Sequence, residues 1–194
     1  MQKIIKEDIE RICGEVLPWE KLKHKRILVT GASGFLGTYI VLSLIECNRR
    51  YDTDITINAL CRSKEKAYIK FKEYWDNDYL QLVFQDVCDD IEDTYKSDII
   101  IHAASPANPY VIQQQPYDVV QANVIGYSKL LEKARKWNTE QIILFSSSAV
   151  YGYSSPEGGA SEEYRDSIDF TNYKDVYCLS KQMCEMMTVC FVKT

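Results

Sequence analysis

The chain has 194 residues, enough for one domain with a sizeable core, and its 46% hydrophobic and 26% charged residues argue against disorder. The formal net charge is −5, so we do not expect a nucleic-acid-binding surface, which needs a basic patch. The one basic cluster, between Lys21 and Arg26, is short, and we interpret it as a solvated lead-in to the first strand.

The seven cysteines and two histidines lack the spacing of a metal site. No Cys-x-x-Cys pair occurs, and His24 and His102 are far apart, so we predict no metal. An odd number of cysteines without a paired pattern is typical of reduced thiols in the cytoplasm. The first residues lack the apolar core of a signal peptide, and no apolar run approaches the roughly 20 residues of a membrane helix. We therefore expect a cytoplasmic protein without a membrane partner.

Residues 1–25 precede the first predicted strand and predict an accessory helix. Five apolar residues recur at helical spacing: Ile4, Ile5, Ile9, Ile12 and Val16. Pro18 ends the pattern. We expect a short amphipathic helix on the outside of the fold, and a helix that dimerises or binds a partner is the alternative.

The stretch from Ile27 to Gly37 predicts a strand, a tight turn and the start of a helix. Its first three residues are apolar, as in a parallel strand that is buried on both faces. Gly31 permits the turn, Gly34 leaves room for a phosphate, and Gly37 lets the helix pack closely on the strand. A helix that begins at Phe35 directs free N–H groups at that phosphate. The stretch therefore predicts a dinucleotide site, and a tight turn without a ligand is the alternative.

Strands and helices alternate along the rest of the chain. The predicted strands are 54–61, 80–84, 98–101 and 141–145, and the predicted helices are 35–47, 63–75, 116–137 and 177–192. This alternation predicts an α/β fold, a Rossmann-type doubly wound parallel sheet with helices on both faces. Ligands of such sheets bind at the carboxyl ends of the strands. Notable residues follow these ends: Arg62, Asp86, Ala103 to Ser105 and Ser146 to Ser148.

Tyr177 and Lys181 are four residues apart on the last predicted helix, so they share one face of it. A free phenol has a pKa of about 10, and a nearby ammonium lowers it by favouring the phenolate. The pair is suited to general acid/base catalysis at a sugar hydroxyl while hydride moves to a nicotinamide cofactor. Ser147 is placed to orient the substrate oxygen and share the proton. For the pair alone, an exposed tyrosine beside a surface lysine is the alternative.

Six motifs occur in the order seen in extended short-chain dehydrogenases/reductases. They are Gly31-x-x-Gly34-x-x-Gly37, Asp86-Val87, His102 to Ser105, Asn123, Ser146 to Gly152 and Tyr177-x-x-x-Lys181. From about Lys25 onward the chain resembles the NAD-dependent epimerase/dehydratase branch, whose members act on nucleotide sugars. The resemblance implies an NAD(P)-dependent epimerase-type enzyme with a nucleotide-sugar substrate. It also implies a homodimer formed through helices that correspond to 116–137 and 177–192, with Tyr127, Leu130, Leu131 and Met183 as the residues expected at the contact.

The resemblance further implies the role of each site residue. The cofactor-binding residues are Gly31, Ser33, Gly34, Phe35, Leu36, Gly37, Asp86, Val87, Ala103, Ala104, Ser105, Asn123, Tyr177 and Lys181. Among them, the glycine turn holds the pyrophosphate, and Asp86 and Val87 lie beside the adenine. Asn123 steadies the central helix and the active site. The catalytic set is Ser147, Tyr177 and Lys181.

The end of the second predicted strand departs from the family pattern. NAD-preferring members place an acidic residue there to bind the ribose hydroxyls. This chain has Cys61-Arg62-Ser63-Lys64 instead. Arg62 and Lys64 are suited to a 2′-phosphate, which favours NADP, whereas the family favours NAD. We therefore keep both NAD and NADP as candidate cofactors. The alternative to a phosphate site is that Arg62 and Lys64 are two solvated basic residues without a ligand.

Ala149 stands where dehydratases and decarboxylases of the family commonly place an acidic residue, just before Val150-Tyr151-Gly152. Proton abstraction beside a 4-keto group then lacks its usual agent. This favours 4-epimerisation or simple keto reduction. A 4,6-dehydratase or a UDP-glucuronate decarboxylase with a second acid/base from Glu157, Glu162 or Glu163 is the runner-up.

Family members usually run on well beyond the helix that carries Tyr177 and Lys181. We therefore expect residues 26–194 to be a Rossmann domain that is incomplete at its C-terminus, with most of the substrate domain absent. A cofactor-binding fragment without turnover is the alternative of another class.

Overall fold

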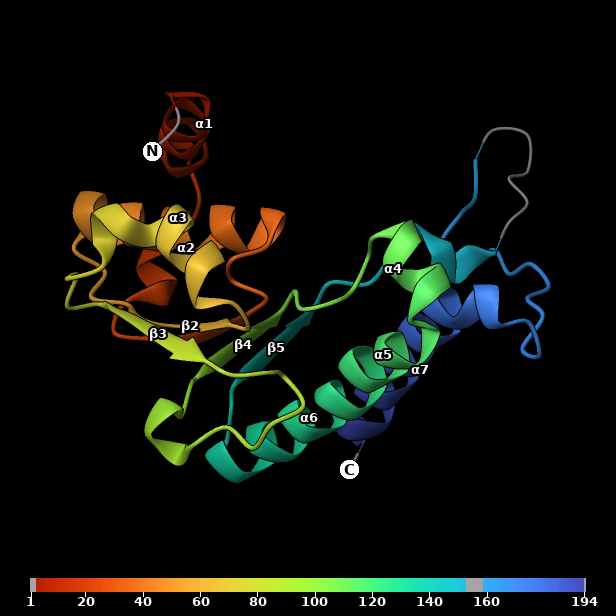
Figure 1. Cartoon of the computed structure of the whole chain (residues 1–194). Coiled ribbons are helices and arrows are strands. Elements are labelled where there is room, and N and C mark those ends of the chain that lie inside the picture. The colour runs from red at the N-terminus through yellow and green to blue at the C-terminus, as the bar shows by residue number, and fades with distance from the viewer. Residues whose placement is uncertain (1–2, 153–158, 194) are drawn as a thin grey trace. The chain divides into compact units, whose positions relative to one another are not determined.

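The computed structural model describes residues 3–152 and 159–193. The helices are α1 (Lys3–Gly14), α2 (Phe35–Tyr51), α3 (Lys64–Phe71), α4 (Pro109–Gln114), α5 (Pro116–Val120), α6 (Gly126–Trp137) and α7 (Val176–Lys193) (Figure 1). The strands are β1 (Arg26–Thr30), β2 (Thr56–Cys61), β3 (Leu80–Phe84), β4 (Ile99–His102) and β5 (Gln141–Leu144). A π-helical turn, Gln121–Ile125, joins α5 to α6.

The five strands form one sheet in the order β3-β2-β1-β4-β5. β1 pairs in parallel with β2 and with β4, and β2 pairs in parallel with β3. Thr30, the last residue of β1, is in register with Leu60 on one side and His102 on the other. The direction of the strand order changes between β1 and β4, and ligands of open α/β sheets bind at the carboxyl ends of such a pair. The predicted Rossmann-type parallel sheet is confirmed.

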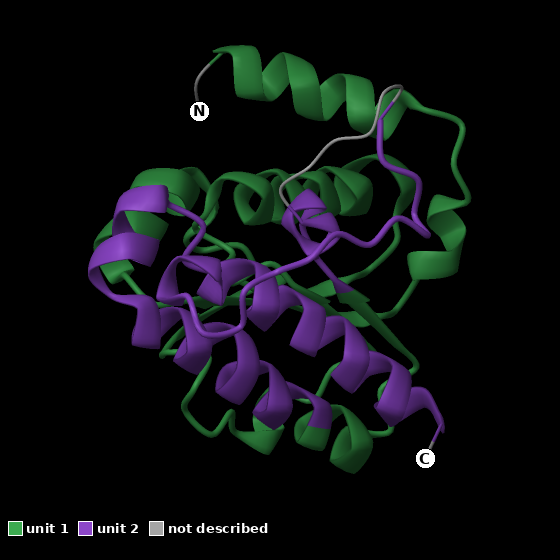
Figure 2. Ribbon diagram, turned by 90° about the vertical axis from the view of Figure 1, so that its right-hand side faces the viewer, with its two compact units in different colours: residues 1–104, 132–143 green, residues 105–131, 144–194 purple. Residues whose placement is uncertain are grey.

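The chain divides into two compact units, which Figure 2 colours separately. Unit 1 comprises residues 1–104 and 132–143, and unit 2 comprises residues 105–131 and 144–194. The glycine turn and the first four strands belong to unit 1. The helices α4, α5 and α7 belong to unit 2, together with Tyr177 and Lys181.

The core of unit 1 contains apolar side chains from the sheet and from α1, α2 and α3. Ile27 and Val29 of β1 are buried in one cluster with Val41 of α2 and Phe71 of α3. Leu28, which points to the opposite face of the strand, is also fully buried. β1 is therefore buried on both faces, as its continuous apolar run predicts.

The accessory helix is confirmed, but it is shorter than its periodicity suggests. Ile9 and Cys13 of α1 are buried in the core cluster. The helix ends at Gly14, so the prediction that Val16 continues its apolar face is wrong, and Val16 is fully exposed. Glycine is a poor helix former, and the proline at position 18 prevents the helix from resuming.

Other boundaries differ by a few residues. The predicted helix 63–75 ends as α3 at Phe71 and continues as a 3-10 turn, Lys72–Tyr74. The predicted helix 116–137 is interrupted by the π-helical turn. The short helix α4 was not predicted, although Asn108 caps it and Pro109 occupies its first turn. None of the described helices is long and apolar enough to cross a membrane.

Candidate active site

The glycine turn of unit 1 is tightly packed on the backbone around it. Gly31 has φ +65°, and a Cβ there would lie 2.8 Å from Cα of Ala104. A Cβ on Gly37 would lie only 2.3 Å from the carbonyl oxygen of Gly31. The hydroxyl of Thr38 donates to the carbonyl of Gly34 at 2.6 Å and ties the turn to α2. Glycine is therefore required at position 31 by conformation and by space, and at position 37 by space.

The N-terminus of α2 provides the cradle that a pyrophosphate needs. Its cap residue is Gly34, and among the described residues no side chain caps this end of the helix. Phe35 and Leu36, in the first turn, are 77% and 50% exposed. The first N–H groups of a helix lack intrahelical partners, and its dipole favours an anion there. The turn therefore fits the diphosphate of a dinucleotide.

Thr30 fastens the carboxyl ends of β1 and β4 together. Its buried hydroxyl shares a hydrogen bond with Nδ1 of His102 at 2.8 Å and accepts one from the N–H of Ala104 at 3.2 Å. These bonds position Ala103 and Ala104, two predicted cofactor-binding residues, beside the glycine turn. Thr30 was not among the predicted site residues. The available signal was a polar residue in a buried strand directly before Gly31.

The carboxyl end of β2 lies next to the same turn. The N–H of Ala32 donates to the carbonyl of Leu60 at 3.1 Å, and Ser33 hydrogen-bonds to the thiol of Cys61. Burial raises the pKa of this thiol to about 11, so Cys61 is an inert apolar residue in this position. Arg62, the next residue, has a side chain that is 81% exposed.

Asp86 and Val87 follow β3 in unit 1, as predicted. A carboxylate oxygen of Asp86 lies 3.9 Å from the guanidinium of Arg62, and the other accepts from the N–H of Cys88 at 2.9 Å. Val87 is buried. Gln85 was not predicted, and its side-chain nitrogen is buried without a hydrogen-bond partner among the described residues. A buried amide donor beside Asp86 is suited to a ligand acceptor.

In unit 2, α7 is fastened to the segment that carries Ser147. Lys181 donates to the carbonyl of Phe145 at 2.7 Å, and Cys178 donates to the carbonyl of Ala149 at 2.8 Å. Two further bonds join the same pair of segments, Gln182 to the carbonyl of Val150 at 2.7 Å and Ser146 to Glu185 at 2.5 Å. Four hydrogen bonds thus join the helix with Tyr177 and Lys181 to the segment with Ser147.

Lys181 is the most buried member of the predicted catalytic set. Its side chain is almost fully buried, and this burial lowers the pKa of its ammonium group. Ser147 is partly buried, and its hydroxyl oxygen accepts from the N–H of Ala149 at 3.2 Å. A hydroxyl that accepts one bond still carries its own proton to donate. Tyr177 is partly exposed in the first turn of α7.

Asn123 lies in the π-helical turn and is fully buried. Its amide donates to the hydroxyl of Ser180 at 2.8 Å, and its backbone carbonyl accepts from the thiol of Cys184 at 3.0 Å. Its side-chain oxygen has no hydrogen-bond partner in the described part of the chain, and neither does the buried hydroxyl of Ser105. Buried polar atoms of this kind are suited to a bound ligand or water. Asn123 therefore anchors α7 to the π-helical turn, and its role in the active site stays a prediction.

The carboxylates proposed for the runner-up chemistry are not part of the arrangement around Ser147. Glu162 and Glu163 are both exposed, and Glu157 lies outside the described residues. Ala149, at the position where the family commonly has an acid, lies in a 3-10 turn directly after Ser147 and Ser148. In residues 3–152 and 159–193, no group of three His, Cys, Asp or Glu side chains could hold a metal ion.

The model of the NAD-dependent epimerase/dehydratase family matches residues 27–193, which is most of the chain. The chain belongs to this family. A nicotinamide dinucleotide is the cofactor of the family, and the glycine turn described above fits its diphosphate. α1 precedes the matched residues.

Curated relatives and solved structures agree with the family and the fold. UDP-glucuronic acid decarboxylase 3 of Arabidopsis thaliana is 32% identical over 66% of this chain and 35% of that protein. The UDP-N-acetylglucosamine 4-epimerase of Methanobrevibacter ruminantium superposes with a TM-score of 0.73 at 24% identity, over 89% of this chain and 52% of that one. A dTDP-glucose 4,6-dehydratase of Bacillus anthracis in complex with NAD superposes with a TM-score of 0.68 at 21% identity, over 87% of this chain and 51% of that one. The chain covers 35% to 45% of the length of three curated relatives that it matches.

Proposed function

We propose that this chain is the cofactor-binding and catalytic part of a nucleotide-sugar 4-epimerase. The carrying observation is the set of four hydrogen bonds that fastens α7 to the segment from Phe145 to Val150. They hold Ser147, Tyr177 and Lys181 on two adjoining segments of unit 2. Family membership supports the nicotinamide cofactor and the class of substrate.

The three side chains have complementary parts in the chemistry. When bound, a nicotinamide dinucleotide would supply the acceptor for a hydride from C4 of the sugar and the donor that returns it to the opposite face of the same carbon. Tyr177 removes the proton of the C4 hydroxyl and returns it in the second half-reaction. Ser147 donates its hydroxyl proton to the substrate oxygen and orients it. The buried positive charge of Lys181, held by the carbonyl of Phe145, favours the phenolate form of a neighbouring tyrosine.

Ala149 favours epimerisation over elimination or decarboxylation. Elimination of water and loss of carbon dioxide both follow oxidation at C4, and in the family the elimination uses a further acid/base group. A methyl side chain cannot supply that proton transfer. UDP-glucuronic acid decarboxylation is the second candidate, because relatives at 28% to 32% identity carry that name.

The homodimer and the cytoplasmic location stay predictions. Of the residues expected at a dimer contact, Met183 on α7 is 48% exposed, whereas Tyr127 and Leu130 are buried within the monomer. A second copy would therefore meet α7 through its exposed side chains. Light scattering of the purified chain measures this directly.

The test of the function is turnover of sugar nucleotides by the wild-type chain and by Tyr177→Phe. We expect the chain to interconvert UDP-glucose and UDP-galactose, or their N-acetyl forms, and the variant to lose about 100- to 10,000-fold of the rate. Tyr173→Phe is the matched control, because Tyr173 is an exposed tyrosine on the 3-10 turn just before α7. It should keep the wild-type rate.

The products separate the candidates. Release of carbon dioxide from UDP-glucuronic acid, with no epimer formed, would replace the epimerase by the decarboxylase. Cofactor binding with no conversion of any of these sugars by the folded chain would contradict an enzymatic function for it. Equal activity of Tyr177→Phe and wild type would remove Tyr177 from the mechanism.

A further inference from the structure

The residues at the carboxyl end of β2 determine which groups the adenosine ribose of a dinucleotide would meet. Ser33, in the glycine turn, contacts the thiol of Cys61, so the end of β2 borders the diphosphate cradle directly. In dinucleotide-binding folds, an acidic residue near this end of the strand accepts hydrogen bonds from the ribose hydroxyls. Here that position holds a buried thiol followed by an exposed guanidinium.

Two cationic side chains, Arg62 and Lys64, lie around this position, together with the carboxylate of Asp86. Arg62 projects into solvent, with 81% of its side chain exposed. The ammonium of Lys64 lies 5.8 Å from the ring centre of Phe84, at the carboxyl end of β3. A guanidinium and an ammonium only donate hydrogen bonds, and a planar guanidinium matches a phosphate with two parallel bonds. The site is therefore better matched to a phosphate than to a pair of hydroxyls.

Asp86 gives Arg62 a partner that a ligand can replace. The carboxylate lies 3.9 Å from the guanidinium, which is a weak pair at an exposed position. Asp86 keeps its own hydrogen bond from the N–H of Cys88 when Arg62 turns away. Moving Arg62 from this carboxylate to a doubly charged phosphate thus leaves no buried polar atom unpaired.

From these contacts we infer that Arg62, assisted by Lys64, binds the 2′-phosphate of NADP, so that this member of an NAD-dependent family prefers NADP. The inference rests on the dinucleotide site of the proposed function. It names the cofactor and the residue that selects it.

The experiment is calorimetric titration of the purified chain with NADP, NAD, 2′,5′-ADP and ADP. We expect wild type to bind NADP and 2′,5′-ADP at least about tenfold more tightly than NAD and ADP, with an advantage that shrinks as salt is added. Arg62→Ala should lower the affinity for NADP by about 10- to 100-fold and leave the affinity for NAD unchanged. Arg62→Asp should reverse the preference.

Lys70→Ala is the matched control, because Lys70 is an exposed cation in the last turn of α3, the helix that begins at Lys64 shortly after Arg62. It should leave both affinities unchanged. Tighter binding of NAD than of NADP by wild type would overturn the inference and leave the proposed function intact. Equal loss of both affinities in Arg62→Ala would also overturn it. If neither dinucleotide binds to the folded chain, the proposed function fails together with the inference.

Discussion

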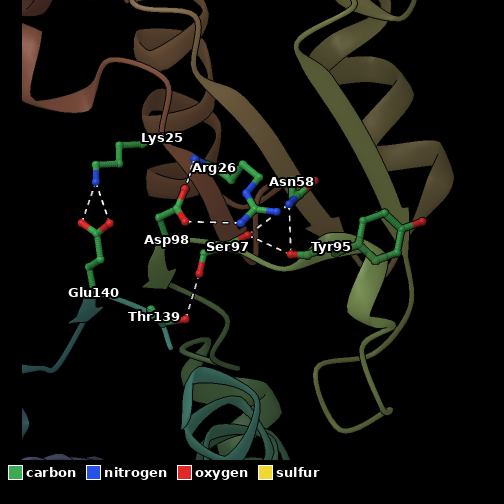
Figure 3. Close-up of polar contacts among 8 residues, drawn as sticks. All are labelled: Lys25, Arg26, Asn58, Tyr95, Ser97, Asp98, Thr139 and Glu140. Atoms are coloured by element: carbon green, nitrogen blue, oxygen red, sulfur yellow. Dashed lines mark hydrogen bonds and ion pairs between the residues drawn. The ribbon is translucent and has the colours of Figure 1, made fainter. Parts of the chain in front are cut away.

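The two ends of the sheet in unit 1 differ in how their polar groups are paired. At the amino end, charged and polar side chains bind one another (Figure 3). The carboxylate of Asp98 accepts from the backbone N–H of Arg26 at 2.8 Å, and Asn58 donates to the hydroxyl of Ser97 at 3.1 Å. Thr139 donates to the carbonyl of Ser97 at 2.8 Å and brings the start of β5 into the network. Most of these polar groups are therefore satisfied by the protein itself, and the exception among the described residues is the buried side-chain oxygen of Asn58.

At the carboxyl end, small residues allow two backbone segments to approach each other closely. Polar groups there remain available to bind a ligand. A Cβ on Gly31 would lie 2.8 Å from the backbone of Ala104, and no side chain of the described residues caps α2 at Gly34. Gln85 contributes a buried donor that lacks a partner among the described residues. The difference indicates that the amino end serves stability and the carboxyl end serves binding. Substitutions at the two ends should therefore have different signatures.

Gly31→Ala should have the largest effect on both stability and dinucleotide binding. The new Cβ would meet the backbone of Ala104 at 2.8 Å, and the left-handed φ of +65° disfavours a side chain. We expect a loss of about 2–5 kcal/mol in the free energy of unfolding and loss of dinucleotide binding. Urea unfolding and calorimetry measure the two effects.

Gly159→Ala distinguishes the cost of a side chain at positive φ from the cost of a steric clash. Gly159 also has a positive φ, +95°, but a Cβ there would meet no atom of the described residues within 4 Å, its chain neighbours aside. This variant should cost only about 1–2 kcal/mol and leave dinucleotide binding intact. Equal effects of the two variants would show that the close approach of Gly31 to Ala104 is unimportant.

Asp98→Ala should disrupt the hydrogen-bond network at the amino end of the sheet without changing cofactor binding. The Asp98 side chain is 24% exposed, and its removal leaves the N–H of Arg26 without its acceptor. We expect a loss of about 1–3 kcal/mol in the free energy of unfolding and an unchanged affinity for the dinucleotide. Glu140→Gln is the control, because the pair of Glu140 with Lys25 is more exposed and should contribute less than about 1 kcal/mol. A large loss of cofactor affinity in Asp98→Ala would end the distinction between the two ends.

The elements of the fold could be predicted because their signals are local. β3 was predicted at its observed bounds, and β4 was placed within one residue, since short apolar runs between polar residues mark buried strands. Helix ends were less accurate, because capping and tertiary contacts decide them. α2 runs to Tyr51, where Asp52 takes a left-handed conformation that no periodicity reveals.

The candidate site could be predicted only where its motifs are contiguous. The glycine turn and the pair of Tyr177 and Lys181 are visible as spacings in one segment. Thr30, Gln85 and the contact of Ser33 with Cys61 depend on which strands are neighbours, and strand order is not encoded in any single stretch. The four bonds that fasten α7 to the segment from Phe145 to Val150 are likewise long-range. They explain how Ser147 is positioned, which the sequence left open.

The smallest predicted effect concerns Asp93, in the 3-10 turn that leads toward the amino end of β4. Its carboxylate accepts hydrogen bonds from Lys136 and from the indole N–H of Trp137, and these lower the pKa of Asp93 from 3.8 to about 2. Because the folded state binds this proton less readily than the unfolded chain, ionised Asp93 stabilises the fold above about pH 4, and this contribution is lost as the pH falls toward 2.

Asp93→Asn should therefore lower the thermal midpoint at pH 7, and its difference from wild type should vanish near pH 2. Circular dichroism at pH 7, 4 and 2 measures this dependence. Glu92→Gln, at the exposed residue before it, is the control and should follow the wild-type profile at every pH. Because the group is exposed, added salt should shrink the difference at pH 7. A difference that stays the same at pH 2 would show that Asp93 acts through packing rather than charge, and the amino end would then depend on shape as the carboxyl end does.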